Sequence, residues 1–131
     1  LPQDVTGLAP NDFQPIIDGF VLVEPPQLSL AAGRDARVPL MLGTNRDETY
    51  RFLPPPAQVA TPMAFETAAR VFLGQYGLSR AIEDQVLAAY PVTDYSSPHA
   101  ALVALSTDIR WSCPARAILR AVAASPNPPP T

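Results

Sequence analysis

Clusters of proline divide this chain into blocks and set where regular structure can begin. The 131 residues include 17 prolines, which gather at Pro25-Pro26, at residues 54–56 and at residues 126–130. Proline fixes its own φ and biases the preceding residue away from the helical conformation. Helices should therefore begin after these clusters, and the first two clusters are predicted turns between elements. Residues 125–131 are predicted to form a proline-rich extended loop or tail.

The clearest helix signal follows residue 60. Thr61-Pro62 supplies an N-cap followed by proline at the first helical position, and Gly77 is the predicted end. Glu66 and Arg70 are spaced i and i+4 on this helix, as in a helical ion pair. The apolar residues expected on its buried face are Phe65, Ala68, Phe72 and Tyr76.

Further helices are predicted on both sides of this one. Ser79 is the expected cap of a helix that runs to Tyr90, and Ser97-Pro98 opens a longer helix that Pro114 should kink or restart. A short helix is predicted over residues 27–32, closed by Gly33, and a helical turn over residues 47–53. The apolar positions expected to face inward on the longer helices are Ile82, Val86, Leu87, Leu102, Leu105, Ile109, Ile118, Leu119 and Val122.

Only residues 38–42 (VPLML) are typical of a buried core strand. Asp18-Gly19 indicates a turn between short strands over residues 16–17 and 20–23. A lone core strand leaves backbone donors and acceptors unpaired on both edges. The inventory of elements therefore suggests a fragment of a larger fold, and it predicts self-association through the exposed strand edge.

Composition excludes several functional classes. The net charge of −3 and the pI near 4.9 argue against a nucleic-acid surface, which needs clustered positive charge. No apolar run approaches the roughly 20 residues that cross a membrane. With one cysteine, Cys113, an internal disulfide is excluded and soft metal ligands are lacking. We therefore predict no nucleic-acid partner, no membrane association, no metal and no cofactor.

The order of several motifs resembles a known family. Residues 13–19 (FQPIIDG), residues 38–48 (VPLMLGTNRDE), Thr107-Asp108 and residues 113–116 (CPAR) occur at spacings similar to those of type-B carboxylesterases, which include para-nitrobenzyl esterases and cholinesterases. The resemblance covers residues 11–123. It implies an α/β class with a partial α/β-hydrolase fold, mostly helical, with one core strand and a few short strands. On this interpretation residues 1–131 are a single segment from the C-terminal half of the domain.

The resemblance assigns one catalytic residue to this chain. Glu48, the second carboxylate of the Asp47-Glu48 pair, matches the position of the family's triad acid. Such an acid accepts a hydrogen bond from the imidazole Nδ1–H and stabilises the imidazolium that forms during catalysis. Thr49 departs from the glycine or alanine that often follows the acid in the family.

The rest of a triad is not recognisable in the sequence. No serine lies in the Gly-x-Ser-x-Gly setting of the α/β-hydrolases, whose chain order is serine, acid, histidine. The resemblance therefore places the serine before residue 1 and the histidine after residue 131. His99 is the single histidine, and we expect it to be a partly exposed residue at a helix start without a catalytic role.

Other candidate residues favour structural roles. Asp47 is expected to cap the following turn. Asp108 and Arg110 are expected to belong to a structural ion pair, whose partner can lie outside this chain. Cys113 precedes a proline in an apolar context, which favours a buried and inert thiol over a nucleophile. Phe72, Tyr76 and Trp111 are candidates for an acyl pocket, although aromatic residues at helical spacing are typical of a plain core.

Three functions remain as hypotheses. The first is a fragment of a serine carboxylesterase that hydrolyses small-molecule esters through an acyl-enzyme, supplies the triad acid and is inactive alone. The second is a non-catalytic, cholinesterase-like module that binds a partner. The third is an independent helical domain, which would unfold cooperatively and expose no sheet edge.

Overall fold

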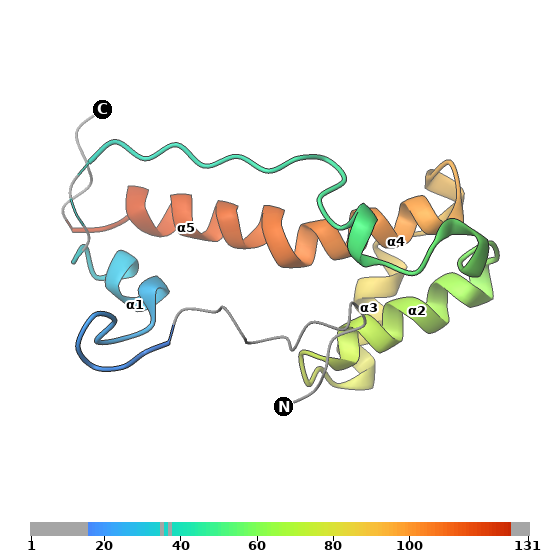
Figure 1. Cartoon of the computed structure of the whole chain (residues 1–131), viewed down its shortest axis with the longest axis horizontal. Helices are drawn as coiled ribbons and strands as arrows, with labels where there is room; N and C mark the ends of the chain where they lie inside the picture. Colours follow the sequence, from blue (N-terminus) through green and yellow to red (C-terminus); the bar gives the residue numbers. More distant parts are fainter. Residues whose placement is uncertain (1–15, 35, 37, 127–131) are drawn as a thin grey trace. The chain divides into compact units, whose positions relative to one another are not determined.

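The computed structural model describes residues 16–34, 36 and 38–126 of the chain (Figure 1). These residues belong to two compact units. The central unit is Asn45–Trp111, and the terminal unit combines Leu1–Thr44 with Ser112–Thr131. The turn that carries Glu48 lies in the central unit.

The central unit is an assembly of short helices. Its α-helices are α2 (Pro62–Gly74), α3 (Arg80–Ala88) and α4 (Pro98–Thr107), and its 3₁₀ turns are η1 (Tyr50–Phe52), η2 (Pro56–Gln58) and η3 (Val92–Asp94). Helix α2 packs against α4 and α3. The shared core is formed by Val59, Phe65, Ala69, Phe72, Leu73, Ala101, Leu102 and Leu105.

The predicted capping residues begin two of these helices. The Thr61 hydroxyl accepts a hydrogen bond from the Ala64 N–H at 3.1 Å, and the Ser97 hydroxyl accepts one from the Ala100 N–H at 3.1 Å. Both interactions satisfy donors that a helix start leaves without an internal partner. Ser79 precedes α3 as expected, but its side chain makes no capping hydrogen bond.

Arg70 joins α2 to α3 through its guanidinium group. It contacts Glu66 at 2.8 Å, as the i,i+4 spacing predicted, and it also contacts Glu83 at 3.2 Å and Asp84 at 2.7 Å. The pKa of Arg70 is raised, mainly by its hydrogen bond to Asp84. Glu83 is buried while Ile82 is 46% exposed. The predicted inward face of α3 is therefore wrong at Ile82, because the ion pair draws Glu83 toward α2.

The terminal unit contains α1 (Pro26–Ala31) and α5 (Cys113–Ala123), which pack against each other. Helix α1 begins at Pro26, one residue before the predicted start at residue 27, because proline is tolerated in the first turn of a helix. The π-helical segment η4 (Asp108–Ser112) precedes α5, and Pro114 lies in the first turn of α5. Proline lacks the N–H of a regular helix, so an irregular turn is expected at this position. The predicted interruption at Pro114 is confirmed.

The part of the chain that the structure describes contains no β-strand. Residues 38–42 have no regular structure, and their side chains are exposed rather than buried. Residues 16–17 and 20–23 form no strand either, although the Asp18 carboxylate accepts the N–H groups of Phe20, Val21 and Leu22 in the predicted turn. A strand requires a hydrogen-bonded neighbour, which the described residues do not supply. The α/β-hydrolase fold thus stays a prediction.

Candidate functional site

Glu48 lies on a tight turn that leads directly into η1. The Tyr50 N–H donates to the Asp47 carbonyl at 3.2 Å, and the Phe52 N–H donates to the Thr49 carbonyl at 2.9 Å. The half-buried Glu48 side chain folds back on this turn, and its Oε1 accepts the Asn45 N–H at 2.8 Å. Among the described groups, no other one donates a hydrogen bond to this carboxylate. One carboxylate oxygen is therefore held in place, and the other is available as an acceptor.

Thr49 anchors the same turn in the protein interior. Its side chain is 1% exposed, and its Oγ1 lies 2.6 Å from Ser106 Oγ and 3.1 Å from Thr107 Oγ1, both on α4. The Thr49 hydroxyl also lies 3.2 Å from the Val103 carbonyl oxygen. The residue next to Glu48 thus enters a buried cluster of hydroxyl groups, which we call the hydroxyl cluster (Thr49, Ser106 and Thr107).

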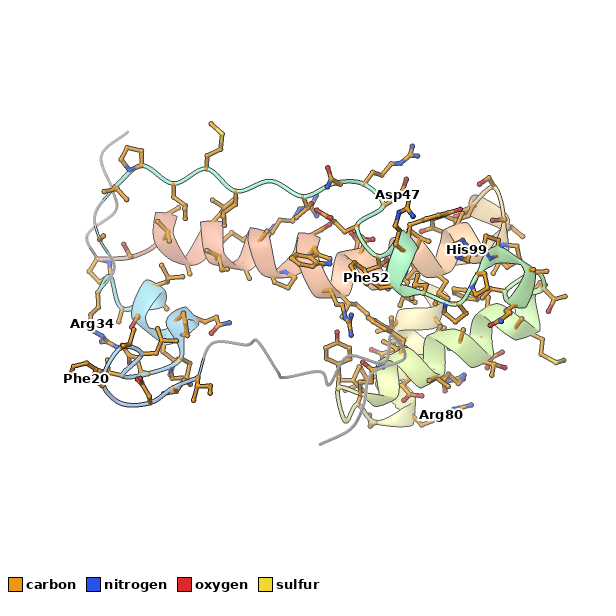
Figure 2. The ribbon with its side chains drawn as sticks, viewed as in Figure 1. Phe20, Arg34, Asp47, Phe52, Arg80 and His99 are labelled. Atoms are coloured by element: carbon orange, nitrogen blue, oxygen red, sulfur yellow. The ribbon has the colours of Figure 1, made fainter. Side chains whose placement is uncertain are left out.

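Tyr50, the following residue, contacts the single histidine. Its ring meets the His99 ring edge to face, with centroids 5.3 Å apart. His99 lies in the first turn of α4 (Figure 2) and is 4% exposed. The prediction of a partly exposed histidine is therefore wrong, because the η1 turn covers the start of α4.

The described residues do not assemble a catalytic triad around His99. No hydrogen bond joins its ring to Glu48 or to a described serine, and its buried Nε2 has no partner among them. A general base must lie within hydrogen-bond reach of the group it deprotonates. The geometry thus gives His99 a packing role against Tyr50.

Asp47 differs from its neighbour Glu48 in its environment. Its carboxylate pairs with Arg46 at 3.1 Å, and the two side chains are 50% and 92% exposed, respectively. The turn is closed instead by the Asp47 backbone carbonyl and by the Glu48 carboxylate. The predicted capping role of Asp47 is therefore wrong, because η1 begins after Thr49 without a side-chain capping hydrogen bond.

Asp108 and Arg110 have separate partners within the central unit. Asp108 accepts a hydrogen bond from the Tyr90 hydroxyl at 2.9 Å. Arg110 donates to Gln75 at 3.3 Å and lies over the Phe72 ring at 5.3 Å. The predicted structural ion pair is absent from the described residues.

The remaining candidates are split between core and surface. Phe72 is in the core, whereas Tyr76 and Trp111 are about half exposed. Cys113 is exposed, so the prediction of a buried thiol is wrong, because the first turn of α5 does not enter a core.

Neither a group of metal-ligating side chains nor a membrane-spanning helix occurs in the described ranges. No group of three or more histidine, cysteine, aspartate or glutamate side chains there is arranged to hold a metal ion. Within the same residues, no helix has both the length and the apolar character needed to cross a bilayer.

Sequence reasoning missed the hydroxyl cluster next to the predicted acid. Thr49 was noted only as a departure from a family pattern, and Ser106 and Thr107 follow an apolar stretch of α4. Hydroxyl side chains that continue a buried helical face require hydrogen-bond partners. The position of Ser106 and Thr107 after the apolar stretch of α4 could have indicated buried hydroxyl groups. It does not show which other segment supplies their hydrogen-bond partners.

Comparison with known proteins gives a carboxylesterase-like origin for the chain. The chain is similar to the para-nitrobenzyl esterase of Bacillus subtilis (strain 168), with 31% identity over 103 residues. The match covers 79% of this chain and 19% of that esterase, so the chain spans about a fifth of its relative's length. No protein-family model matches the chain. No solved structure matches it either.

Proposed function

We propose that this chain is the carboxyl-side portion of a serine carboxylesterase with an α/β-hydrolase fold, and that Glu48 is the acid of its catalytic triad. The similarity to a para-nitrobenzyl esterase supports the class of enzyme. The observation that carries the proposal for Glu48 is its hydrogen bonding. Oε1 is held by the Asn45 N–H at 2.8 Å, while Oε2 of this half-buried side chain accepts no hydrogen bond from a described group and is available to a histidine.

In this mechanism Glu48 accepts a hydrogen bond from the Nδ1–H of a histidine elsewhere in the parent protein. That histidine takes the proton of a serine hydroxyl through Nε2, and the serine oxygen attacks the ester carbonyl. The alcohol leaves with the proton from the imidazolium, which yields an acyl-enzyme. Water then releases the carboxylic acid by the same route. Glu48 stabilises the imidazolium in both steps and stays ionised.

The exposed apolar segment 38–42 fits the same proposal. Met41 is 94% exposed and Val38 is 58% exposed, although both are residue types that favour burial. In the complete α/β-hydrolase sheet this segment would pair with neighbouring strands and be covered on both faces. In the isolated chain, a second copy is the proposed partner for it.

The test is steady-state hydrolysis of a para-nitrobenzyl ester by the complete protein encoded by the reading frame. Glu48→Gln keeps the size of the side chain but removes its charge, so kcat is expected to fall roughly 10³- to 10⁴-fold. Asp47→Asn is the matched control, because it neutralises an exposed carboxylate next to Glu48. This control is expected to stay within about twofold of the unmodified enzyme.

Equal activity of Glu48→Gln and the unmodified enzyme would overturn the assignment of the triad acid. A correctly folded complete protein without esterase activity would overturn the enzyme proposal and favour the cholinesterase-like binding module. A reading frame that encodes a Gly-x-Ser-x-Gly elbow upstream and a His-Gly pair downstream would support the proposal. The isolated 131-residue chain is expected to be inactive.

A further inference from the structure

The two residues that follow Glu48 are held by one face of α4. His99, Val103, Ser106 and Thr107 are spaced i, i+4, i+7 and i+8, so they share a single stripe of the helix. His99 contacts Tyr50, and the other three contact Thr49. A different face of α4, which includes Leu102 and Leu105, enters the core. The helix therefore connects the Glu48 turn to the core of the central unit.

Of the proton assignments that the distances allow, the following one satisfies every hydroxyl of the hydroxyl cluster. The Ser106 hydroxyl donates to the Leu102 carbonyl at 2.7 Å, and the Thr49 hydroxyl donates to Ser106 Oγ at 2.6 Å. The Thr107 hydroxyl donates to Thr49 Oγ1 at 3.1 Å, and Thr107 Oγ1 accepts the Thr49 N–H at 3.4 Å. Each hydroxyl has one proton to donate, and each is used once.

This arrangement fixes both the side chain and the backbone of Thr49. The three hydroxyl-bearing residues are 0–1% exposed, and every partner within reach of the Thr49 hydroxyl, including the Val103 carbonyl, lies on α4. Breaking these buried hydrogen bonds would leave polar groups away from water, so they hold a defined geometry. The backbone of Thr49 is joined directly to Glu48. Rotation of the turn would break the Thr49 hydrogen bonds as well as the contact between Asn45 and Glu48.

We infer that Thr49 is a positioning residue, which orients the Glu48 carboxylate toward the catalytic histidine through its buried hydroxyl. The inference rests on the proposed role of Glu48 as the triad acid. Glycine or alanine at this position has no hydroxyl, so this anchor is a property of the present chain. Thr49 itself lies in the interior and does not touch the substrate.

The first test measures the geometry of Glu48 without reference to catalysis. In the 131-residue chain, Glu48→Gln should change the NMR shift of the Asn45 amide proton, because this N–H donates to the Glu48 carboxylate. The size of that change is the Asn45 response. Thr49→Val, which replaces the hydroxyl by a methyl group, is expected to reduce this response by at least about half. Thr49→Ser should restore it. Thr67→Val is the matched control, because the Thr67 hydroxyl bonds only the exposed Met63 carbonyl.

The second test uses esterase kinetics of the complete protein. Thr49→Val is expected to lower kcat about tenfold at unchanged KM, because a misplaced catalytic group loses transition-state stabilisation. In the Glu48→Gln background the same substitution should have no further effect on kcat. A purely structural role would instead give the same loss in both backgrounds.

An unchanged Asn45 response in Thr49→Val would overturn the inference, as would equal kcat losses in the two backgrounds. If Glu48→Gln leaves activity intact while Thr49→Val abolishes the Asn45 response, the proposed function fails but the positioning geometry stands. If Thr49→Val does not fold, Thr107→Val removes the hydroxyl that donates to Thr49 and serves for the same two measurements.

Discussion

The central and terminal units differ in how much of their apolar surface they bury. The core cluster lies entirely within the central unit, where α2 and α4 supply most of its residues. In the described part of the terminal unit, Val122 is the one fully buried hydrophobic side chain. Phe20 of the terminal unit, by contrast, is 89% exposed (Figure 2).

The central unit therefore has its own hydrophobic core, whereas most of the described apolar side chains of the terminal unit are exposed to solvent. Burial of apolar surface is the main favourable contribution to folding, so the central unit has a source of stability within its own sequence. The terminal unit pairs two helices but leaves residues 16–23 and 38–42 largely open. On the proposed function, other parts of a longer esterase would cover these open residues of the terminal unit.

The largest expected effect is on the free energy of unfolding of the central unit. Leu105 is fully buried, and Leu105→Ala should destabilise this unit by about 2–5 kcal/mol. The matched change in the terminal unit, Leu28→Ala, affects a side chain that is 57% exposed and should change stability by less than about 0.5 kcal/mol. Urea unfolding monitored by circular dichroism measures both. Similar effects of the two substitutions would remove the contrast between the units.

A smaller effect is expected on self-association through the terminal unit. Leu40 lies in the open apolar segment and is 42% exposed, so Leu40→Lys should shift the isolated chain from a dimer to a monomer, because charge at a strand edge opposes pairing. Light scattering coupled to size exclusion gives the mass. Val71→Lys, on an exposed face of α2, is the control and should leave the mass unchanged. A monomeric unmodified chain would contradict the prediction.

The smallest expected effects are on how stability depends on pH. A terminal-unit carboxylate loses its contribution at low pH, and a central-unit tyrosine loses its contribution at high pH. Hydrogen bonds from Arg34 hold the pKa of Glu24, in the terminal unit, below its ordinary value of 4.5. This contribution to stability is present above about pH 4.5 and is lost as the pH falls through the folded pKa. Burial, followed by the nearby Asp108 and Asp94, raises the pKa of Tyr95 in the central unit above 10.0.

The Tyr95 contribution is therefore present below pH 10 and is lost as the pH rises through the folded pKa. NMR titration of Glu24 should show its low pKa, and Arg34→Gln should return it toward the ordinary value. Absorbance at alkaline pH should show a late-titrating tyrosine that disappears in Tyr95→Phe. A Glu24 pKa that does not respond to Arg34→Gln would contradict the assigned cause.

Local sequence signals predicted the helices well, because their causes are local. Pro62 and the capping hydroxyls of Thr61 and Ser97 act within one helical turn, and the structure confirms these two helix starts. The interruption at Pro114 has the same local origin. Residues 38–42 differ because strand formation depends on a neighbouring strand that the local sequence does not specify.

Burial of individual side chains in the candidate site was harder to predict. The predicted exposure of His99 and the predicted burial of Cys113 were both wrong. Periodicity along one helix shows which residues share a face, but it does not show which distant segment covers that face. His99 is covered by Tyr50, which lies far from it in the sequence. For the same reason, the motif that contains Glu48 was recognisable from the sequence while the anchor at Thr49 was not.

The hydroxyl cluster has a consequence for how this protein can evolve. Thr49 contacts both Ser106 and Thr107, so loss of the Thr49 hydroxyl alone leaves the buried Thr107 hydroxyl without an acceptor for its proton, at a cost of about 1–3 kcal/mol. Replacement of the whole set by apolar residues avoids most of this penalty. Homologues should therefore carry either the hydroxyl set or an apolar set at these positions. Such covariation is a form of epistasis that joins a loop to a helix more than fifty residues later in the chain.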